Sequence, residues 1–219
     1  MEESAKTNLI RGEAFVQKYF SGKVIDIGAG QRFVVPNAEP FDKKHGDANT
    51  IDQCREPESY DCVHSSHCLA NMHDPVDAIG RWWKLVKPGG HLIVIVPDED
   101  LYEQGVWPSR FNPDNKATFR LDKSETSWSP CSFDLRSLVE GLPDAKLISA
   151  EVQDHHYDRS MLRLGPENDN GVFMRKLMMR LYTHLLKRNL LPIPLCCAEL
   201  NRFFFQLGAT VDQTVGPAL

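Results

Sequence analysis

The 219-residue chain lacks a long hydrophobic run. Its most apolar stretch, Leu92–Val96, is far shorter than the roughly 20 residues that a membrane-spanning helix needs. The first residues, Met1-Glu2-Glu3-Ser4, are acidic and are not followed by an apolar segment. We therefore expect no transmembrane helix, no secretory signal peptide and a cytoplasmic location.

Metal-binding cysteine pairs and an excess of positive charge are also absent. The six cysteines include no Cys-x-x-Cys pair, which favours reduced thiols. His64, His67 and His73 are close in sequence, but strand residues alternate between faces and need not converge, so we expect no metal site. The formal net charge is −5, whereas nucleic-acid-binding proteins usually carry a basic face. We therefore expect no nucleic-acid partner.

Segments typical of strands and helices alternate along the first half of the chain. This alternation predicts an α/β fold of Rossmann-like type, with a mostly parallel sheet and helices on both faces. Strands are expected at 23–27, at a segment ending at 41–42, and at 60–66, 91–96, 146–152 and 209–218. Helices are expected at 8–20, 75–86 and 133–140, with a turn at 87–90. The stripe expected to face inward from the second helix consists of Val76, Ile79, Trp82, Trp83 and Val86.

Two later segments break this alternation within what we expect to be one domain, 1–219. Residues 98–130 are rich in Asp, Pro, Asn, Ser and aromatics without a clear period, which is typical of a lid or binding loop. Residues 171–189 predict a helix with one basic side, inside a helical insertion of about 160–207. That helix can cover the sheet or form a homodimer face, or it can contact an anionic membrane surface peripherally.

A glycine turn, Asp26-Ile27-Gly28-Ala29-Gly30, follows the first predicted strand. Two glycines allow a ligand to approach the backbone closely. A dinucleotide fingerprint would place a third glycine at position 33, which is Phe33. The turn therefore disfavours a pyrophosphate and a nicotinamide-dependent oxidoreductase.

Carboxylates follow at positions suited to a nucleoside. Asp42 closes the second predicted strand, where an acid can accept two hydrogen bonds from ribose hydroxyls. Asp47, in Gly46-Asp47-Ala48, is placed to reach an adenine amino group. Either acid alone could equally be a solvated loop residue, so the prediction depends on the set and its order.

The connections between the first strands are unusually short. Eleven residues separate Ile27 from Glu39, and Pro36 interrupts them. A parallel crossover usually needs a dozen or more residues and a helix. We expect a pared-down N-terminal half, in which the first crossover helix is reduced to a turn and the outermost strand is missing or vestigial.

Four segments in order resemble successive motifs of the class I S-adenosylmethionine (SAM)-dependent methyltransferases. The likeness is greatest to the methyltransferase type 11 group and covers roughly residues 20–100. The motifs are Val24–Gly30, Gly46–Ala48, Tyr60–Leu69 and Leu85–Leu92. A weaker resemblance, over Tyr102–Asn112, is to a subgroup associated with bacterial surface-polysaccharide biosynthesis.

The resemblance implies a site for SAM, which carries no phosphate and needs only the first part of the glycine turn. The implied cofactor residues are Asp26, Gly28, Ala29, Gly30, Asp42, Asp47, Ala48, Ser65 and Ser66. Asp26 would order the loop, Gly28 and Gly30 would approach the methionine part, and Ser65, Ser66 and His67 would line the pocket beside the reactive methyl group.

The resemblance says less about the residues that would bind and deprotonate the methyl acceptor. A hydroxyl nucleophile needs a base, for which His67 is the first candidate and His73 the second. The lid residues that could hold a sugar by stacking and hydrogen bonding are Tyr102, Trp107, Arg110, Asn112 and Lys116. Alternatively, the lid packs only on its own aromatics. We expect methylation of a small molecule or glycan, on oxygen.

Two departures from the family pattern favour an alternative. Leu69-Ala70-Asn71 stands where relatives commonly have Leu-Glu-His, and Asp114-Asn115-Lys116 stands where the subgroup commonly has Asp-His-Lys. Both changes replace groups that can titrate with groups that cannot. The alternative is a SAM-binding protein with weak or no transfer activity and a regulatory or scaffolding role.

Overall fold

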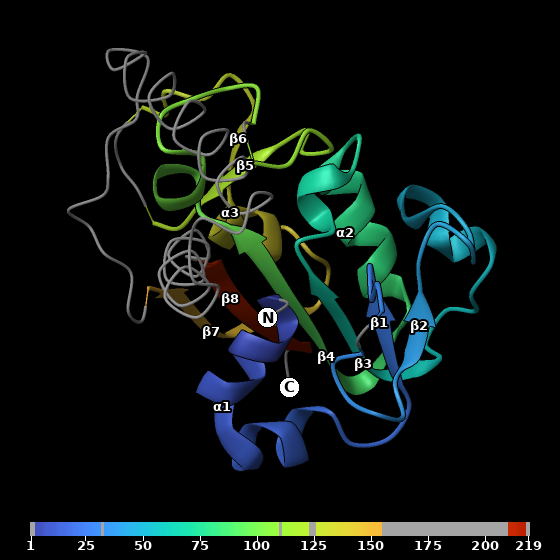
Figure 1. Cartoon of the computed structure of the whole chain (residues 1–219). Coiled ribbons are helices and arrows are strands. Elements are labelled where there is room, and N and C mark those ends of the chain that lie inside the picture. The colour runs from blue at the N-terminus through green and yellow to red at the C-terminus, as the bar shows by residue number, and fades with distance from the viewer. Residues whose placement is uncertain (1–2, 32, 110, 123–125, 155–209, 218–219) are drawn as a thin grey trace, which may run out of the picture.

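The computed structural model describes residues 3–31, 33–109, 111–122, 126–154 and 210–217 (Figure 1). The predicted basic helix 171–189 and the surrounding insertion of about 160–207 lie outside these ranges. Within them, no helix combines the length and the apolar character needed to cross a bilayer.

A six-stranded sheet in the order β2-β1-β3-β4-β8-β7 forms the centre of the fold. Its strands are β1 (Val24–Ile27), β2 (Glu39–Phe41), β3 (Tyr60–Ser66), β4 (Val86–Pro97), β7 (Ala145–Gln153) and β8 (Thr210–Pro217). The first four in spatial order are parallel, and β8 runs antiparallel to both β4 and β7. The predicted mostly parallel, Rossmann-like α/β fold is confirmed.

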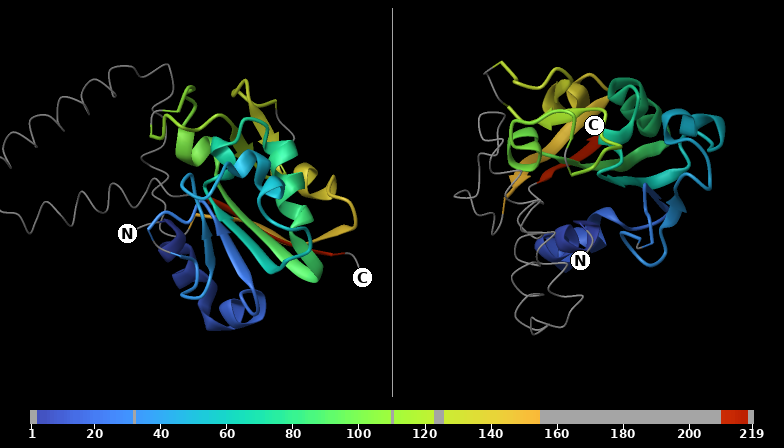
Figure 2. Two further views of the ribbon diagram at one scale, coloured as in Figure 1. Left: turned by 90° about the vertical axis from the view of Figure 1, so that its right-hand side faces the viewer. Right: turned by 45° about the horizontal axis from the view of Figure 1, so that its top comes forward.

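Helices cover both faces of this sheet, as predicted (Figure 2). The strands alternate between faces: Ile25 and Ile27 enter the larger core cluster, and Val24 enters the smaller one. The larger cluster packs under α2 (Pro75–Lys84) and α3 (Leu135–Glu140), and the smaller packs under the end of α1 (Glu3–Tyr19). Burial of both apolar faces fixes the strand register, because a one-residue slip would turn every side chain over.

The N-terminal half is pared down, as the short connections predicted. In the described part of the chain, no helix joins β1 to β2, and only the 3₁₀ helix η1 (Ala48–Gln53) lies between β2 and β3. Strand β2 is the edge of the sheet on this side. In the described part of the chain, the loops that follow β1 and β2 therefore contain no crossover α-helix.

Two local predictions were wrong. Val76 does not face inward but is 52% exposed, because Pro75, Ala78, Ile79 and Trp82 form the buried stripe of α2. The expected turn at 87–90 is an excursion within β4: Val86 pairs with Tyr60, whereas His91 already pairs with Cys62. The backbone therefore bulges there and then rejoins the sheet.

The segment 98–130, predicted to lack regular structure, contains two short elements. A single-turn π-helix, η3 (Glu99–Glu103), is followed by β5 (Thr118–Arg120), which pairs with β6 (Ser132–Asp134) in a separate two-stranded sheet. Buried Glu99 accepts hydrogen bonds from the hydroxyls of Thr118, Ser127 and Ser132. Its carboxylate thus ties together the distant parts of this segment, a connection that sequence periodicity does not reveal.

Candidate functional site

A pocket of about 590 Å³ opens at the carboxyl ends of β1, β2 and β3. This is the edge of a parallel sheet at which α/β proteins bind ligands. Its walls come from the loops after these strands and from the 112–116 part of the lid. The lining residues are Gly28, Phe41, Asp42, Lys43, Gly46, Asp47, Ala48, Asn49, Ser66, His67, Cys68, Asn71, Met72, His73, Asn112, Asp114 and Lys116.

Gly28 begins the glycine turn, and its geometry admits no side chain. Its φ is +80°, and a Cβ atom would lie 2.7 Å from the Cβ of Cys68. Its amide donates to the carbonyl of Phe41 over 2.7 Å, which joins the loop ends of β1 and β2. Gly30 also has a positive φ, +59°, but a Cβ there would meet nothing within 4 Å. Neither Gly30 nor Ala29 is among the lining residues.

Asp26 lies beneath the pocket and outside its lining. It is 2% exposed and uses both carboxylate oxygens: Oδ2 accepts from the amide of Val34 and Oδ1 bonds His64 Nδ1, each over 2.7 Å. The first bond anchors the loop after β1. His64, on the neighbouring strand, is a partner that sequence reasoning missed, although the pairing of β1 with β3 places the two residues side by side.

The two predicted ribose and adenine acids both line the pocket. Asp42 is half-buried, and its Oδ1 accepts from the amide of Lys43 over 2.7 Å. Asp47 is the N-cap of η1, where its Oδ1 accepts from the amide and the side-chain nitrogen of Asn49. These bonds, the side-chain one first, lower the pKa of the Asp47 carboxyl below its ordinary value.

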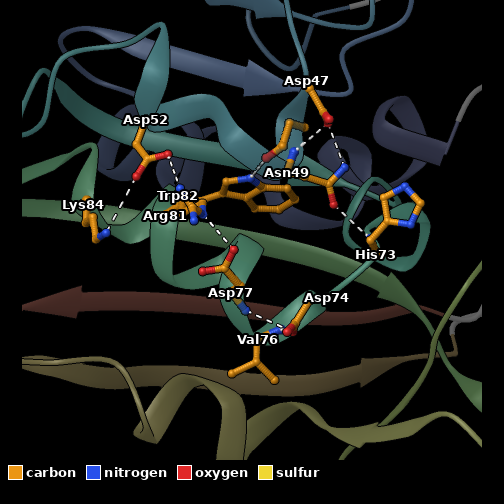
Figure 3. Close-up of polar contacts among 11 residues, drawn as sticks. Asp47, Asn49, Asp52, His73, Asp74, Val76, Asp77, Arg81, Trp82 and Lys84 are labelled. Carbon is orange, nitrogen blue, oxygen red and sulfur yellow. Dashed lines mark hydrogen bonds and ion pairs between the residues drawn. The ribbon is translucent and has the colours of Figure 1, made fainter.

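Asn49 links Asp47 to His73, as Figure 3 shows. Its Oδ1 accepts from the amide of His73 over 2.9 Å while its Nδ2 donates to Asp47. The positive charge that His73 can carry contributes to the lowered pKa of Asp47. His73 therefore lies on the same side of the pocket as this acid.

Helix α2 holds this wall in place. The indole Nε1 of fully buried Trp82 donates to the carbonyl of Ala48 over 2.9 Å. The residue before it, Arg81, pairs with Asp52 of η1 at 2.8 Å and with Asp77 of its own helix at 2.7 Å (Figure 3). The loop after β2 is thus tied to the core even though no crossover helix supports it.

The end of β3 presents a serine and a histidine to the pocket. Ser66 Oγ lies 2.9 Å from His67 Nδ1. His67 has a φ of +63°, and its amide donates to the carbonyl of Ile95 on β4 over 2.8 Å, which holds the turn. Ser65 is fully buried and is not in the lining. Burial raises the pKa of the Cys68 thiol to about 12, so it remains protonated and is a poor nucleophile.

The lid contacts the pocket wall at two places. The amide of Lys116 donates to the carbonyl of Ala70 over 2.7 Å, and its Nζ donates to the carbonyl of Asn71 over 2.8 Å. Ala70 and Asn71 belong to the 3₁₀ turn η2 (Leu69–Asn71). At the mouth, Lys43 Nζ lies 3.4 Å from Asp114 Oδ2. The lid therefore forms part of the cavity rather than a separate unit.

The residues predicted to hold the acceptor are only partly brought together. Asn112 and Lys116 line the pocket, whereas Tyr102 packs edge-on against Phe111, with ring centroids 5.5 Å apart. Trp107 is not among the lining residues. Arg110 lies outside the described residues. Over the ranges that are described, no group of three His, Cys, Asp or Glu side chains could hold a metal ion.

Several lining residues were missed by sequence reasoning, among them Lys43, Asn49, Cys68, Met72 and Asp114. Most adjoin a predicted site residue or motif, so the motif spacing could have placed them near the pocket. The motif spacing could not have identified which of these residues line the pocket.

A family model described as "Methyltransferase domain" matches residues 13–141, which include the glycine turn, both pocket acids, Ser66 and His67. The chain belongs to this methyltransferase-domain family. Members of the family use SAM as their methyl donor, as the resemblance implied. A search of curated protein sequences found no match.

Solved structures that resemble this chain are distant in sequence. A SAM-dependent methyltransferase from Thermotoga maritima is 17% identical, with a TM-score of 0.42, over 73% of this chain and 77% of that one. The [4+2]-cyclase SpnF is 12% identical, with a TM-score of 0.49, over 99% of this chain and 82% of that one.

A third similar structure is phosphoethanolamine N-methyltransferase 2 from Haemonchus contortus, solved with phosphomonomethylethanolamine and S-adenosylhomocysteine (SAH). It is 14% identical, with a TM-score of 0.44, over 94% of this chain and 51% of that one. Three others are matched over 33%, 61% and 26% of their own length, so this chain spans less than two thirds of each. We assign to this chain none of the substrates that are named for these proteins.

Proposed function

We propose that this chain binds SAM in the pocket at the ends of β1, β2 and β3 and transfers its methyl group to an oxygen of a small-molecule or glycan acceptor. One observation carries the proposal. Gly28, Asp42, Asp47 and the Ser66–His67 pair, which are far apart in sequence, all line one pocket of about 590 Å³. That volume lies within the range of small-molecule and cofactor sites.

The residues present fit the donor's chemistry. Asp42 offers a carboxylate to ribose hydroxyls, and the second oxygen of Asp47 remains for an adenine amino group, since Asn49 uses only Oδ1. When bound, SAM supplies an activated methyl group on a sulfonium. Gly28 and Ser66 both line the pocket, and the methionine part would lie against this glycine turn.

Ser66 and His67 together can remove the acceptor's proton. In this proposal Ser66 Oγ–H donates to His67 Nδ1. Ser66 Oγ would take the proton of the acceptor hydroxyl while its own proton passes to His67 Nδ1. The acceptor oxygen would then bond the methyl carbon that the cofactor supplies, as the bond from that carbon to sulfur breaks and SAH leaves. His67 becomes an imidazolium, and histidine is the side chain that most often acts as a general base. The turn that follows β3 holds Ser66 and His67 in position for this proton transfer.

His73 is the weaker candidate for the base. The bond from its amide to Asn49, which also bonds Asp47, supports a role at the proposed adenine end of the pocket. We therefore assign His73 to the cofactor side and expect its removal to alter cofactor affinity more than turnover.

Release of SAH against a panel of sugar nucleotides and lipid-linked sugars tests the assignment. His67→Ala and Ser66→Ala should each lower kcat by about 100-fold or more, the usual cost of losing a general base. His73→Ala is the matched control and should retain kcat within about threefold, a small change on the same scale. Equal turnover by His67→Ala and the wild type would remove His67 from the mechanism.

A second candidate, cofactor binding without transfer, is favoured by Asn71 and Asn115. Both amides are hydrogen-bonded in the site region, and an amide cannot accept a proton at neutral pH. If the base had to come from these positions, the chain would bind SAH and release none from any acceptor. Release of SAH by the wild type that is lost in His67→Ala would decide in favour of methyl transfer and against cofactor binding alone.

A further inference from the structure

A chain of side-chain amides runs from a buried carboxylate to the pocket wall. Glu103, 2% exposed, accepts through Oε1 from Asn115 Nδ2 over 2.9 Å. The opposite end of that amide, Oδ1, accepts from Asn112 Nδ2 over 2.9 Å. The oxygen of Asn112 accepts in turn from the amide of Asp114 over 3.1 Å. The orientation of Asn112 is thus fixed from both of its ends, because a flipped amide would set donor against donor.

This chain determines which atom Asn71 presents to the pocket. Asn71 Oδ1 faces Asn112 Nδ2 at 3.4 Å, so its Nδ2 lies on the other side of the amide. Among the residues described, Nδ2 of Asn71 makes no hydrogen bond, and Asn71 lines the pocket. The wall therefore offers a ligand an oriented N–H donor.

Lys116 adds a positive charge beside this donor. Its Nζ bonds the carbonyl of Asn71 over 2.8 Å, which leaves further ammonium protons for another partner. No carboxylate in the described ranges lies within 4.0 Å of it, whereas Lys43, the other lysine of the pocket, pairs with Asp114. The pocket acids Asp42 and Asp47 come from a different wall, at the end of β2 and the start of η1. The charge of Lys116 makes the smallest of the contributions that lower the pKa of Asp47.

We propose that Asn71 Nδ2 and Lys116 Nζ bind an oxyanion of the methyl acceptor, a carboxylate or a phosphate. The proposal rests on the proposed function, because it takes Asp42 and Asp47 to bind the cofactor. An oxyanion accepts from both donors at once, and hydrogen bonds between charged groups are about twice as strong as neutral ones. The buried carboxylate of Glu103 acts indirectly, because it sets the orientation of the three amides.

Broadening of the ³¹P resonance of inorganic phosphate tests the proposal on the full chain, with and without saturating SAH. The wild type should broaden the signal, and acetate should compete if carboxylates are accepted. Lys116→Met and Asn71→Asp should each weaken phosphate binding about tenfold or more, as expected for a lost charge-assisted bond. The matched controls Lys44→Met and Asn37→Asp change exposed residues outside the pocket and should broaden the signal as the wild type does.

The other outcomes separate this proposal from the assignment of the cofactor. If the donor pair instead binds the carboxylate of the cofactor, Lys116→Met will weaken SAH binding about tenfold and the SAH complex will not bind phosphate, which overturns the proposal. Phosphate binding that is equal in Lys116→Met and the wild type also overturns it. If the wild type binds phosphate through Lys116 but does not bind SAH, the oxyanion site stands and the cofactor assignment fails.

Discussion

Replacement of Trp82 by phenylalanine tests how the cofactor wall is supported. Trp82→Phe keeps an aromatic ring in the core but removes the Nε1 bond to the carbonyl of Ala48. Loss of the partner of a carbonyl at the edge of the core costs about 1–3 kcal/mol. The smaller ring also leaves a void at a position that is 0% exposed, which adds a part of the cost of an aromatic truncation. We expect the free energy of unfolding to fall by about 2–4 kcal/mol.

The same helix offers a matched control. Trp83 Nε1 donates to the carbonyl of Pro143 over 2.9 Å at the surface, away from the pocket. Trp83→Phe should lower the free energy of unfolding by only about 0.5–1.5 kcal/mol, the net value of an ordinary hydrogen bond. Urea unfolding measures both variants, and calorimetric titration with SAH measures the pocket.

The two variants should separate in affinity as well as in stability. Because Ala48 lines the pocket, Trp82→Phe should weaken SAH binding several-fold, whereas Trp83→Phe should bind as the wild type does. SAH affinity that is unchanged in a destabilised Trp82→Phe protein would refute the claim that this bond holds the cofactor wall.

Three further predictions concern the other walls. Asp42→Ala should weaken SAH binding by about 1.5–3 kcal/mol, measured by calorimetry, and unchanged affinity would remove Asp42 from the site. Gly28→Ala should lower the unfolding midpoint in urea far more than Gly30→Ala, since both have positive φ but only Gly28 faces a contact, at 2.7 Å. Asn49→Ala should raise the pKa of Asp47 toward 3.8, measured by carboxyl NMR titration. The lowered pKa of Asp47 stabilises the folded wild type at pH values above 3.8, and this contribution is lost as the pH falls through the lowered pKa. The variant should lack the contribution, so its stability should fall less on acidification below pH 3.8.

The positions of the strands along the chain were predictable because the signals that specify them are local. The buried strand Val24–Ile27 is apolar apart from Asp26, and the brevity of the 28–38 connection was itself evidence against a crossover helix. Val76 was misjudged because an apolar residue in the first turn of a helix can satisfy the period and still face solvent. The bulge at 87–90 was read as a turn because Pro88, Gly89 and Gly90 punctuate turns and bulges alike.

The candidate site was predictable where residues follow the ends of strands. Asp42, Asp47, Ser66 and His67 could be placed together because parallel strands end at one edge of the sheet. The lid could not be placed in this way. Its position depends on contacts between distant residues, such as the bonds from Lys116 to the η2 turn, and no periodic pattern encodes them.

Calorimetric titration of the wild-type chain with SAH, with oxidised nicotinamide adenine dinucleotide as the comparison ligand, tests the central claim most directly. The account predicts one site with micromolar affinity for SAH and no binding of the dinucleotide, because Phe33 stands where its fingerprint needs glycine. A folded protein that gives no binding heat with SAH by calorimetry and no SAH-dependent rise in its unfolding midpoint, or one that binds the dinucleotide instead, would contradict the account.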